Sequence, residues 1–252
     1  MSDTKIAIVT GGSRGIGRNT VLSLAKRGVS SIFTYNSNRA EADKVVALAG
    51  EAGARAVALQ LDTGDVGAFD EFAGRVREAL AEFAAERFDY LVNIAGTSSS
   101  AGLATITEAE MDALYNVHFK GVLFLTQKLL PLMNDGGRIV NISSGLARFA
   151  MPGRIGYGSI KAAVEALTRY MAVELGPRRI AVNVVAPGAI ATDFSGGMVR
   201  DNPHVNKMVA DNTALGRAGA PADVGPVIAA LLSDDFGWVN AQRIEVAGGV
   251  HI

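Results

Sequence analysis

The chain has 252 residues, of which 49% are hydrophobic, and a formal net charge of −1, so it can bury a large core and shows no charge bias towards nucleic acid or an anionic membrane. The absence of cysteine excludes disulfides and a thiolate nucleophile, and the three histidines match no metal-ligand spacing. Without a signal-peptide pattern or a membrane-spanning apolar run, a soluble cytoplasmic protein is expected.

The first predicted strand, residues 5–10, ends in a glycine-rich turn, Gly11-Gly-Ser-Arg-Gly-Ile-Gly17, and a helical pattern follows as far as Gly28. A strand, a glycine turn and a helix in this order are typical of sites where backbone N–H groups bind a pyrophosphate. The spacing differs from the Gly-x-Gly-x-x-Gly fingerprint, and any tight strand–helix turn can use glycines. The position directly after the first strand nevertheless favours phosphate binding.

The second predicted strand, residues 31–35, leads into a segment that bears on the choice of cofactor. An NAD site of this type usually carries an acid about 20 residues after the glycine turn, where it binds the ribose 2′-hydroxyl. No acid occurs between Asp3 and Glu41, and the segment reads Tyr35-Asn-Ser-Asn-Arg39. Together with Arg14 in the turn, these groups suit a 2′-phosphate and favour NADP(H). Solvated surface arginines are the alternative.

The rest of the chain alternates short apolar runs with helical patterns. Further strands are predicted at residues 54–61, 90–94, 138–142, 180–185 and 243–246, and helices at residues 39–49, 69–83, 107–133, 157–176 and 221–232. Thr107 and Glu110 have capping-box spacing. This alternation predicts one α/β domain over residues 1–252, a Rossmann-type doubly wound parallel sheet of about seven strands with helices on both faces. Residues 193–213 show weak periodicity and are expected to form a lid over a site.

Small and polar residues follow several predicted strands. The glycine turn, Asp62, Asn93, Ser144 and Pro187 each stand at a carboxyl end. Because ligands of parallel α/β sheets bind beyond the carboxyl ends of the strands, we expect these residues to converge on one site.

The helix predicted from residue 157 carries a candidate acid–base group. Tyr157 and Lys161 are four residues apart, so they are neighbours on one helix face. A free phenol has a pKa of about 10, and a nearby ammonium group lowers it towards the working range. With Ser144 holding a carbonyl oxygen, these groups could protonate an alkoxide or deprotonate an alcohol. Taken alone, a surface Tyr–Lys pair and an ordinary Ser143-Ser144 turn are the alternative interpretation.

Jointly, these motifs resemble the short-chain dehydrogenase/reductase family of single-domain Rossmann oxidoreductases, and the resemblance runs from residue 5 to residue 249. In chain order the shared motifs are Thr10-Gly11-x-x-x-Gly15-Ile16-Gly17, Asp62, Asn93-x-Ala95-Gly96, Ser144, Tyr157-x-x-x-Lys161, Pro187-Gly188, Gly216-Arg217-x-Gly219-x-Pro221-x-Asp223 and Gly248-Gly249. Ser144 rather than Ser143 takes the place of the catalytic serine, because it precedes Tyr157 by the family's spacing.

The resemblance implies that Tyr157 is the acid–base on the substrate oxygen and that Ser144 holds this oxygen. Lys161 would lower the pKa of the tyrosine and bind the nicotinamide ribose, while hydride passes between the nicotinamide and the carbonyl carbon. A basic residue at Arg14 implies NADP(H), with NAD(H) possible. The residues expected at the cofactor are Gly11, Ser13, Arg14, Gly15, Ile16, Gly17, Tyr35, Asn36, Ser37, Arg39, Asp62, Thr63, Asn93, Ala95, Gly96, Tyr157, Lys161, Pro187, Gly188, Ile190 and Thr192.

Two positions depart from the family pattern. His118 stands where the family has its fourth catalytic residue, an asparagine that fixes a helix distortion and a water leading to the lysine; Asn116 lies two residues earlier, on another face. An imidazole also binds water, so His118 is a candidate proton relay, and a buried structural histidine is the alternative. Ile94 replaces the second residue of the Asn-Asn-Ala-Gly turn and is expected only to pack.

We therefore expect an NADPH-dependent carbonyl reductase or alcohol dehydrogenase that acts on C=O and CH–OH groups. A 3-oxoacyl-[acyl-carrier-protein] reductase is the second candidate, but the cations near the lid, Arg200, Lys207 and Arg217, are offset by nearby acids. A non-catalytic NADP(H)-binding sensor is the alternative from another class.

The substrate-facing segments are expected at residues 97–102, 146–155 and in the lid. Their apolar residues indicate a hydrophobic or aromatic ketone; these are Leu146, Phe149, Met151, Phe194 and Met198. Family members are usually tetramers, which implies a homotetramer. The expected partner is a small-molecule substrate, and no nucleic acid, metal or membrane is expected to bind.

Overall fold

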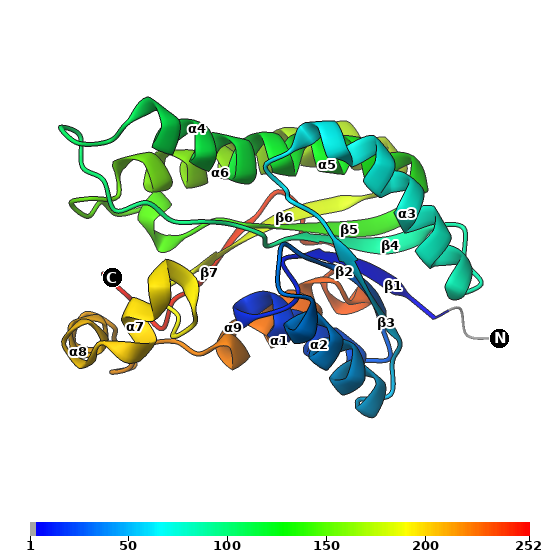
Figure 1. Cartoon of the computed structure of the whole chain (residues 1–252), viewed down its shortest axis with the longest axis horizontal. Helices are drawn as coiled ribbons and strands as arrows, with labels where there is room; N and C mark the ends of the chain where they lie inside the picture. The colour runs from blue at the N-terminus through cyan, green and yellow to red at the C-terminus, as the bar shows by residue number, and fades with distance from the viewer. Residues whose placement is uncertain (1–3) are drawn as a thin grey trace.

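A computed structural model describes residues 4–252, which form a central sheet with helices on both faces (Figure 1). The strands are β1 (Ile6–Thr10), β2 (Ser30–Tyr35), β3 (Ala56–Gln60), β4 (Phe88–Asn93), β5 (Met133–Ile142), β6 (Ala181–Pro187) and β7 (Arg243–Val246). The helices are α1 (Gly15–Ala25), α2 (Arg39–Glu51), α3 (Phe69–Glu82), α4 (Glu108–Tyr115), α5 (Gly121–Leu129), α6 (Ile155–Leu175), α7 (Met198–Asp201), α8 (Pro203–Asp211) and α9 (Pro221–Leu231).

The sheet has seven strands in the order β3-β2-β1-β4-β5-β6-β7, and every neighbouring pair is parallel. The chain builds outward from β1 to β3, then returns to the other side of β1 with β4. Such a switch point leaves a crevice at the carboxyl ends of the two central strands, where ligands of this fold bind. The predicted Rossmann-type parallel sheet is confirmed.

Each face of the sheet buries its own apolar cluster. On one face, Phe69 and Phe72 of α3 and Leu125 of α5 pack against strand residues such as Leu91. On the opposite face, α1, α2 and α9 pack against the sheet, as Figure 1 shows. Strands buried on both faces explain the near-continuous apolar runs in the sequence.

The single helix expected over residues 107–133 is divided. Its capping box is present, because Thr107 and Glu110 exchange hydrogen bonds at the start of α4. Residues Asn116–Lys120 then form a turn of π-helix before α5 begins at Gly121. A Cβ at Gly121 would overlap the Thr63 carbonyl, so this glycine lets α5 approach the end of β3.

Two further segments differ from the expected pattern. β5 starts at Met133, five residues before the predicted strand, and a register shift against β4 accommodates Gly136 and Gly137. The proposed lid contains the two short helices α7 and α8, although its sequence shows weak periodicity. No helix within residues 4–252 is long and apolar enough to span a membrane.

Candidate active site

Three of the four candidate catalytic side chains come from two elements that meet at the carboxyl edge of the sheet. Ser144 follows β5, and Tyr157 and Lys161 lie in the first two turns of α6. The Ser144 hydroxyl is within hydrogen-bonding reach of the Tyr157 phenol, and Lys161 Nζ lies 5.6 Å from the centre of the Tyr157 ring. The fourth, His118, packs edge-on against the same ring with a centroid distance of 5.4 Å. The structure therefore brings all four together.

The two serines at the end of β5 have different roles in the structure. Ser143 Oγ is buried and donates a hydrogen bond to Glu165 Oε1 (2.6 Å). Ser144 Oγ instead accepts from Leu146 N (3.2 Å) and faces Tyr157. Side chains alternate between the two sides of a strand, so adjacent serines point to opposite sides. Ser143 thus fastens β5 to α6, and Ser144 is free to contact a substrate oxygen.

The turn after β5 packs closely on α6 because of a glycine. A Cβ at Gly158 would lie 2.9 Å from the Leu146 carbonyl oxygen, too close for any larger residue to be accepted without a shift. The glycine next to Tyr157 therefore lets the Ser144 turn reach the helix that carries the phenol.

The ionisation of the Tyr–Lys pair differs from the sequence expectation. Surrounding protein atoms displace water from the phenol and raise the pKa of Tyr157 to about 12, against the lowering effects of the Ser144 hydrogen bond and the charge of Arg154. Burial also lowers the pKa of Lys161 to about 7, and its Nζ donates to the Ile142 carbonyl (2.8 Å). Desolvation thus outweighs the expected lowering of the tyrosine pKa by the lysine, and the phenol retains its proton at neutral pH.

His118 is 1% exposed and lies in the π-helical turn. Its Nε2 is 2.8 Å from Thr97 O and 3.1 Å from Thr97 N, whereas its Nδ1 is buried without a hydrogen-bond partner among residues 4–252. Burial, followed by the charge of Lys161, lowers the pKa of His118 well below its usual value. The ring is therefore neutral, and a proton on Nε2 would leave Nδ1 as an acceptor.

The glycine turn has the shape that a pyrophosphate needs. Gly11 and Gly15 have positive φ angles of 66° and 56°, and a Cβ at Gly12 would lie 2.6 Å from Phe33. The first turn of α1 has neither a side-chain cap nor an acidic residue, so its N–H groups and the positive end of its dipole are available to an anion. The residues present fit a dinucleotide phosphate.

Two other predicted cofactor segments border this turn. A Cβ at Gly15 would touch Thr192 (3.4 Å), and one at Gly11 would meet Ala95 (3.0 Å). Ile190 forms an isolated bridge with Gly219, which fixes the segment after β6. The turn after β1 therefore lies against the segments that follow β4 and β6.

The predicted phosphate-binding arginines are both exposed. Arg14 has no ion-pair partner among residues 4–252, whereas Arg39 pairs with Asp43 (2.8 Å) and lies 6.0 Å from the Tyr35 ring centre. Asn36 and Ser37 are exposed beside them at the end of β2. Of the two arginines, Arg14 is therefore the one whose charge is available to a phosphate.

Two predicted cofactor side chains have internal partners. Asn93 is buried, and its amide donates to Asn141 (2.9 Å) and towards Thr126 (3.3 Å). Asp62 is exposed and accepts from Gly64 N (2.8 Å) in a turn. The Asn93 side chain therefore organises the sheet interior, and only its backbone and the turn that follows can face a ligand.

Thr10 is a structural residue that the list of candidate site residues omits, although it belongs to the glycine motif. Its Oγ1 accepts hydrogen bonds from Ile94 N (2.9 Å) and Ala95 N (3.1 Å). Thr34 has the same function one strand away, accepting from Gly11 N (2.9 Å). A hydroxyl at a strand end beside a glycine turn is the sequence signal for this role.

The proposed lid contacts the candidate catalytic residues. The rings of Phe194 and Tyr157 have a centroid distance of 6.0 Å, and Ser195 Oγ bonds to Ser98 Oγ (3.0 Å). Phe194, Met198 and Met151 are each between 41% and 47% exposed. The lid thus presents apolar surface next to the phenol. No cluster of His, Cys, Asp or Glu that could hold a metal occurs among residues 4–252.

Comparison with known proteins identifies relatives along the whole chain. A family model described as enoyl-(acyl carrier protein) reductase matches residues 11–251. The hydroxynaphthalene reductase-like protein Arp2 of Metarhizium brunneum is 37% identical and covers 97% of this chain and 94% of its own. The chain is a member of the short-chain dehydrogenase/reductase family. It is therefore an NAD(P)-dependent oxidoreductase of carbonyl and alcohol groups.

Solved structures agree with this assignment. The promiscuous reductase LugOII, which catalyses keto-reduction at C1 during lugdunomycin biosynthesis, superposes with a TM-score of 0.93 at 37% identity and 98% coverage of both chains. The angucycline C-6 ketoreductase LanV with bound NADP gives a TM-score of 0.92 at 33% identity, covering 97% of this chain and 95% of its own. This member of the short-chain dehydrogenase/reductase family thus resembles reductases of ketones.

Proposed function

We propose that this protein is an NADPH-dependent reductase of hydrophobic, aromatic or fused-ring ketones. The observation that carries the proposal is the gathering of Ser144 and Lys161 around Tyr157, in a fold whose glycine turn leads into an uncapped helix N-terminus. A hydride donor held by that turn would supply the reducing equivalent, and the side chains of this chain would manage the proton.

In ketone reduction the phenol of Tyr157 acts as the acid. Because burial raises its pKa to about 12, the phenol is protonated at neutral pH and can give its proton to the carbonyl oxygen as that oxygen gains charge. Ser144 would hold the same oxygen by a hydrogen bond from its hydroxyl. Lys161, with a pKa of about 7, can pass a proton towards the phenol, and the unpartnered His118 Nδ1 would accept a hydrogen bond from a water on that route.

The cofactor preference is supported by charge and by the relatives. Arg14 stands exposed in the glycine turn without an ion-pair partner among residues 4–252, and no acid follows β2 before Glu41. An arginine that approaches a phosphate forms short, charge-assisted hydrogen bonds. The relative LanV holds NADP, in agreement with the predicted NADP(H) preference.

The substrate class is supported by the lining of the site. Phe194, Tyr157 and His118 bring aromatic surfaces together, and aromatic rings favour stacked or edge-on contacts with other rings. Two of the relatives bear names that refer to hydroxynaphthalene and angucycline substrates. Aromatic and apolar surface beside the phenol favours a planar ring system over a flexible polar sugar.

A 3-oxoacyl-[acyl-carrier-protein] reductase is the second candidate in this class. Such a substrate would need free cations beside the lid to bind an acidic carrier. Each of these cations in or near the lid instead pairs with a carboxylate: Arg200 with Asp193 and Asp201, Lys207 with Asp211, and Arg217 with Asp223. These pairs disfavour a carrier-protein substrate, and the complete Ser144–Tyr157–Lys161 set disfavours a sensor without activity.

We also propose that the chain assembles as a cytoplasmic homotetramer, as the family resemblance implies. Tyr170 and Val173 on α6 are 70% and 76% exposed, and Trp238 is fully exposed, which supports contacts between copies. Size-exclusion chromatography with light scattering measures the mass directly, and a monomer would contradict the proposal.

The deciding experiment for the activity is a substrate screen. Purified protein is mixed with NADPH and a panel of fused-ring ketones, simple aryl ketones, keto-esters and sugars, and the absorbance of NADPH is followed. We expect turnover of fused-ring ketones above that of sugars. Turnover confined to keto-esters or sugars, or NADPH binding without any turnover, would contradict the proposal.

A further inference from the structure

We propose that an alternating chain of four charged residues, Glu165–Arg243–Glu245–Arg148, positions the catalytic serine against the helix of the tyrosine. This inference rests on the proposed reductase function and adds a device for holding its site together. The four residues are positioning residues, because none of them touches the reacting atoms.

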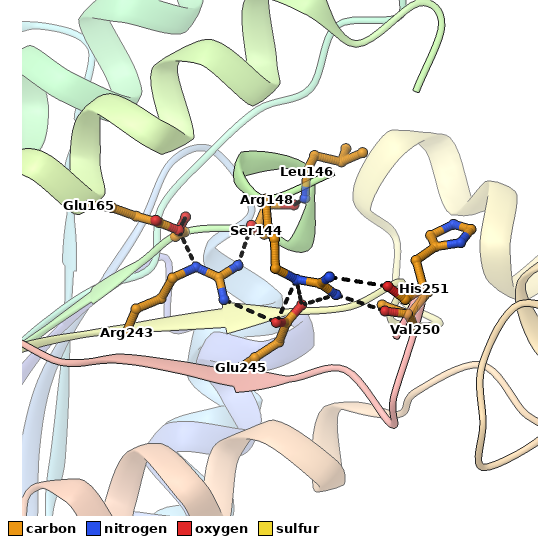
Figure 2. Close-up of polar contacts among 9 residues, drawn as sticks. Ser144, Leu146, Arg148, Glu165, Arg243, Glu245, Val250 and His251 are labelled. Carbon is orange, nitrogen blue, oxygen red and sulfur yellow. Dashed lines mark hydrogen bonds and ion pairs between the residues drawn. The ribbon is translucent and has the colours of Figure 1, made fainter. Parts of the chain in front are cut away.

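The first link joins the two catalytic elements. Glu165 lies on α6, one turn after Lys161 and two turns after Tyr157. Its Oε1 accepts hydrogen bonds from Ser143 Oγ (2.6 Å) and from Arg243 Nε (2.7 Å). Arg243 Nη2 also reaches the backbone oxygen of Ser144 (3.4 Å), as Figure 2 shows. The end of β5 and the catalytic helix are therefore held by one carboxylate and one guanidinium.

The second link fixes the turn after Ser144. Arg243 Nη1 bonds to Glu245 Oε2 (3.1 Å), and Arg148 Nε bonds to the same carboxylate oxygen (2.9 Å). Arg148 also donates to the carbonyl oxygens of Val250 (2.8 Å) and His251 (3.1 Å) (Figure 2). Arg148 belongs to the expected substrate-facing segment, so this link extends from the serine to the substrate wall.

The four charged side chains are partly shielded from water. The side chain of Glu165 is 14% exposed, those of Arg243 and Glu245 are 23% and 26% exposed, and that of Arg148 is 37% exposed. Burial by itself would raise the pKa of Glu245, but hydrogen bonds from Arg148 and Arg243 lower it. Alternating signs keep each buried charge neutralised, and guanidinium groups supply donors in a fixed geometry that a lysine lacks.

The relative position of Ser144 and Tyr157 depends on these four charged residues. The two residues lie on different elements, and a displacement of about 1 Å at a reacting group can cost up to about 100-fold in rate. Other contacts, such as that of Gly158, bring the elements close. The ionic links then fix the direction in which the serine hydroxyl points.

The test compares variants of the four charged residues with a matched control. Arg178 is the control for Arg243, since it also bonds a carboxylate, Asp135, and backbone carbonyl oxygens, but it lies at the amino end of β5, away from the site. We expect Arg243→Gln and Glu165→Leu to lower kcat for ketone reduction about tenfold with NADPH affinity unchanged. Arg178→Gln should leave kcat within about twofold. Glu165→Gln keeps an acceptor for Ser143 and should retain more activity than Glu165→Leu.

The outcomes separate this inference from the proposed function. A loss of thermal stability with kcat unchanged, or an equal loss of kcat in Arg178→Gln, would overturn the positioning role. If the wild-type protein reduces no ketone, the function fails, and the inference is then tested by crystal structures. Ser144 should be displaced relative to Tyr157 in Arg243→Gln; an unmoved Ser144 would refute the inference.

Discussion

The end of β5 with α6 and the lid segment at residues 193–213 flank the same site, but they are held in contrasting ways. Lys161 and His118 are 4% and 1% exposed, and hydrogen bonds such as that from Ser143 to Glu165 fasten the two catalytic elements. The helices α7 and α8 of the lid have no buried residue, and their ion pairs are exposed. Ion pairs in water are screened and contribute little to stability, so the lid is the less stable of the two regions.

The backbone sharpens the contrast. Ser195, Gly196 and Gly197 are consecutive residues with positive φ, and a serine in that region is uncommon. The contacts of the lid with the site are the Ser195–Ser98 hydrogen bond and the Phe194 ring. On the proposed function, the buried region would carry out the chemistry, and the exposed region would decide which substrate is admitted. The following predictions test that division, beginning with the largest effect.

The catalytic region is tested most strongly at the phenol. Tyr157→Phe removes the proton donor but keeps the ring that packs against His118 and Phe194. We expect kcat to fall about 10³-fold with NADPH binding unchanged, measured by initial rates and fluorescence titration. Retained turnover would refute the acid–base role of Tyr157.

The neighbouring imidazole gives the next effect. If His118 Nδ1 binds a relay water, His118→Asn should keep activity, whereas His118→Leu should lose about 100-fold in kcat. Stopped-flow rates in H₂O and D₂O report on the proton step. An active leucine variant would indicate that His118 only packs.

The cofactor side of the site is tested at Arg14. Arg14→Ala should weaken NADPH binding about tenfold and leave NADH binding unchanged, because only NADPH carries a 2′-phosphate. Arg27→Ala is the control, since Arg27 is exposed just after the far end of α1. Isothermal titration with both nucleotides decides the point, and an equal effect on NADH would contradict phosphate recognition.

The lid is expected to affect substrate binding rather than the chemical step. Phe194→Ala removes a ring that contacts Tyr157 and should raise KM for an aromatic ketone about fivefold, with kcat nearly unchanged. Steady-state kinetics separate the two constants. A fall in kcat without a change in KM would show that Phe194 acts in the chemical step, and would contradict the separate role of the lid.

The buried region should also set the pH dependence of stability. Burial lowers the pKa of His118 well below 6.5, so as pH falls below that value the unfolded chain gains a proton that the folded chain does not. The free energy of unfolding then falls by about 1.4 kcal/mol for each pH unit below about 6.5. Urea unfolding at pH 7 and pH 5 should show a smaller loss for His118→Asn than for the wild type; equal losses would contradict this origin.

The sequence predicts most of the framework, because local patterns suffice for it. The apolar runs place the seven strands within a few residues, and the Thr107–Glu110 spacing identifies the start of α4. Local patterns fail at the turn of π-helix at residues 116–120, because its extra residue does not disturb the apolar periodicity. They also miss the start of β5, which depends on the register against β4.

The motifs also predict which residues gather at the site, but not their electrostatics. The i and i+4 spacing of Tyr157 and Lys161 indicates that an ammonium lies near a phenol, and the structure places it 5.6 Å from the ring. The spacing does not reveal that both groups are removed from water. Desolvation raises the pKa of Tyr157, whereas the nearby ammonium is expected to lower it. Burial depends on what packs from other parts of the chain.

Periodicity and motif spacing are properties of neighbouring residues, so they suffice to predict the parallel α/β sheet, the glycine turn and the serine, tyrosine and lysine of the candidate site. The folded arrangement is needed to see that Ser143 is bonded to Glu165 while Ser144 faces Tyr157. The same holds for Arg243 and Arg148, which link this point to Val250 and His251. These contacts join residues up to 103 positions apart, and such distances close only when the whole sheet has formed.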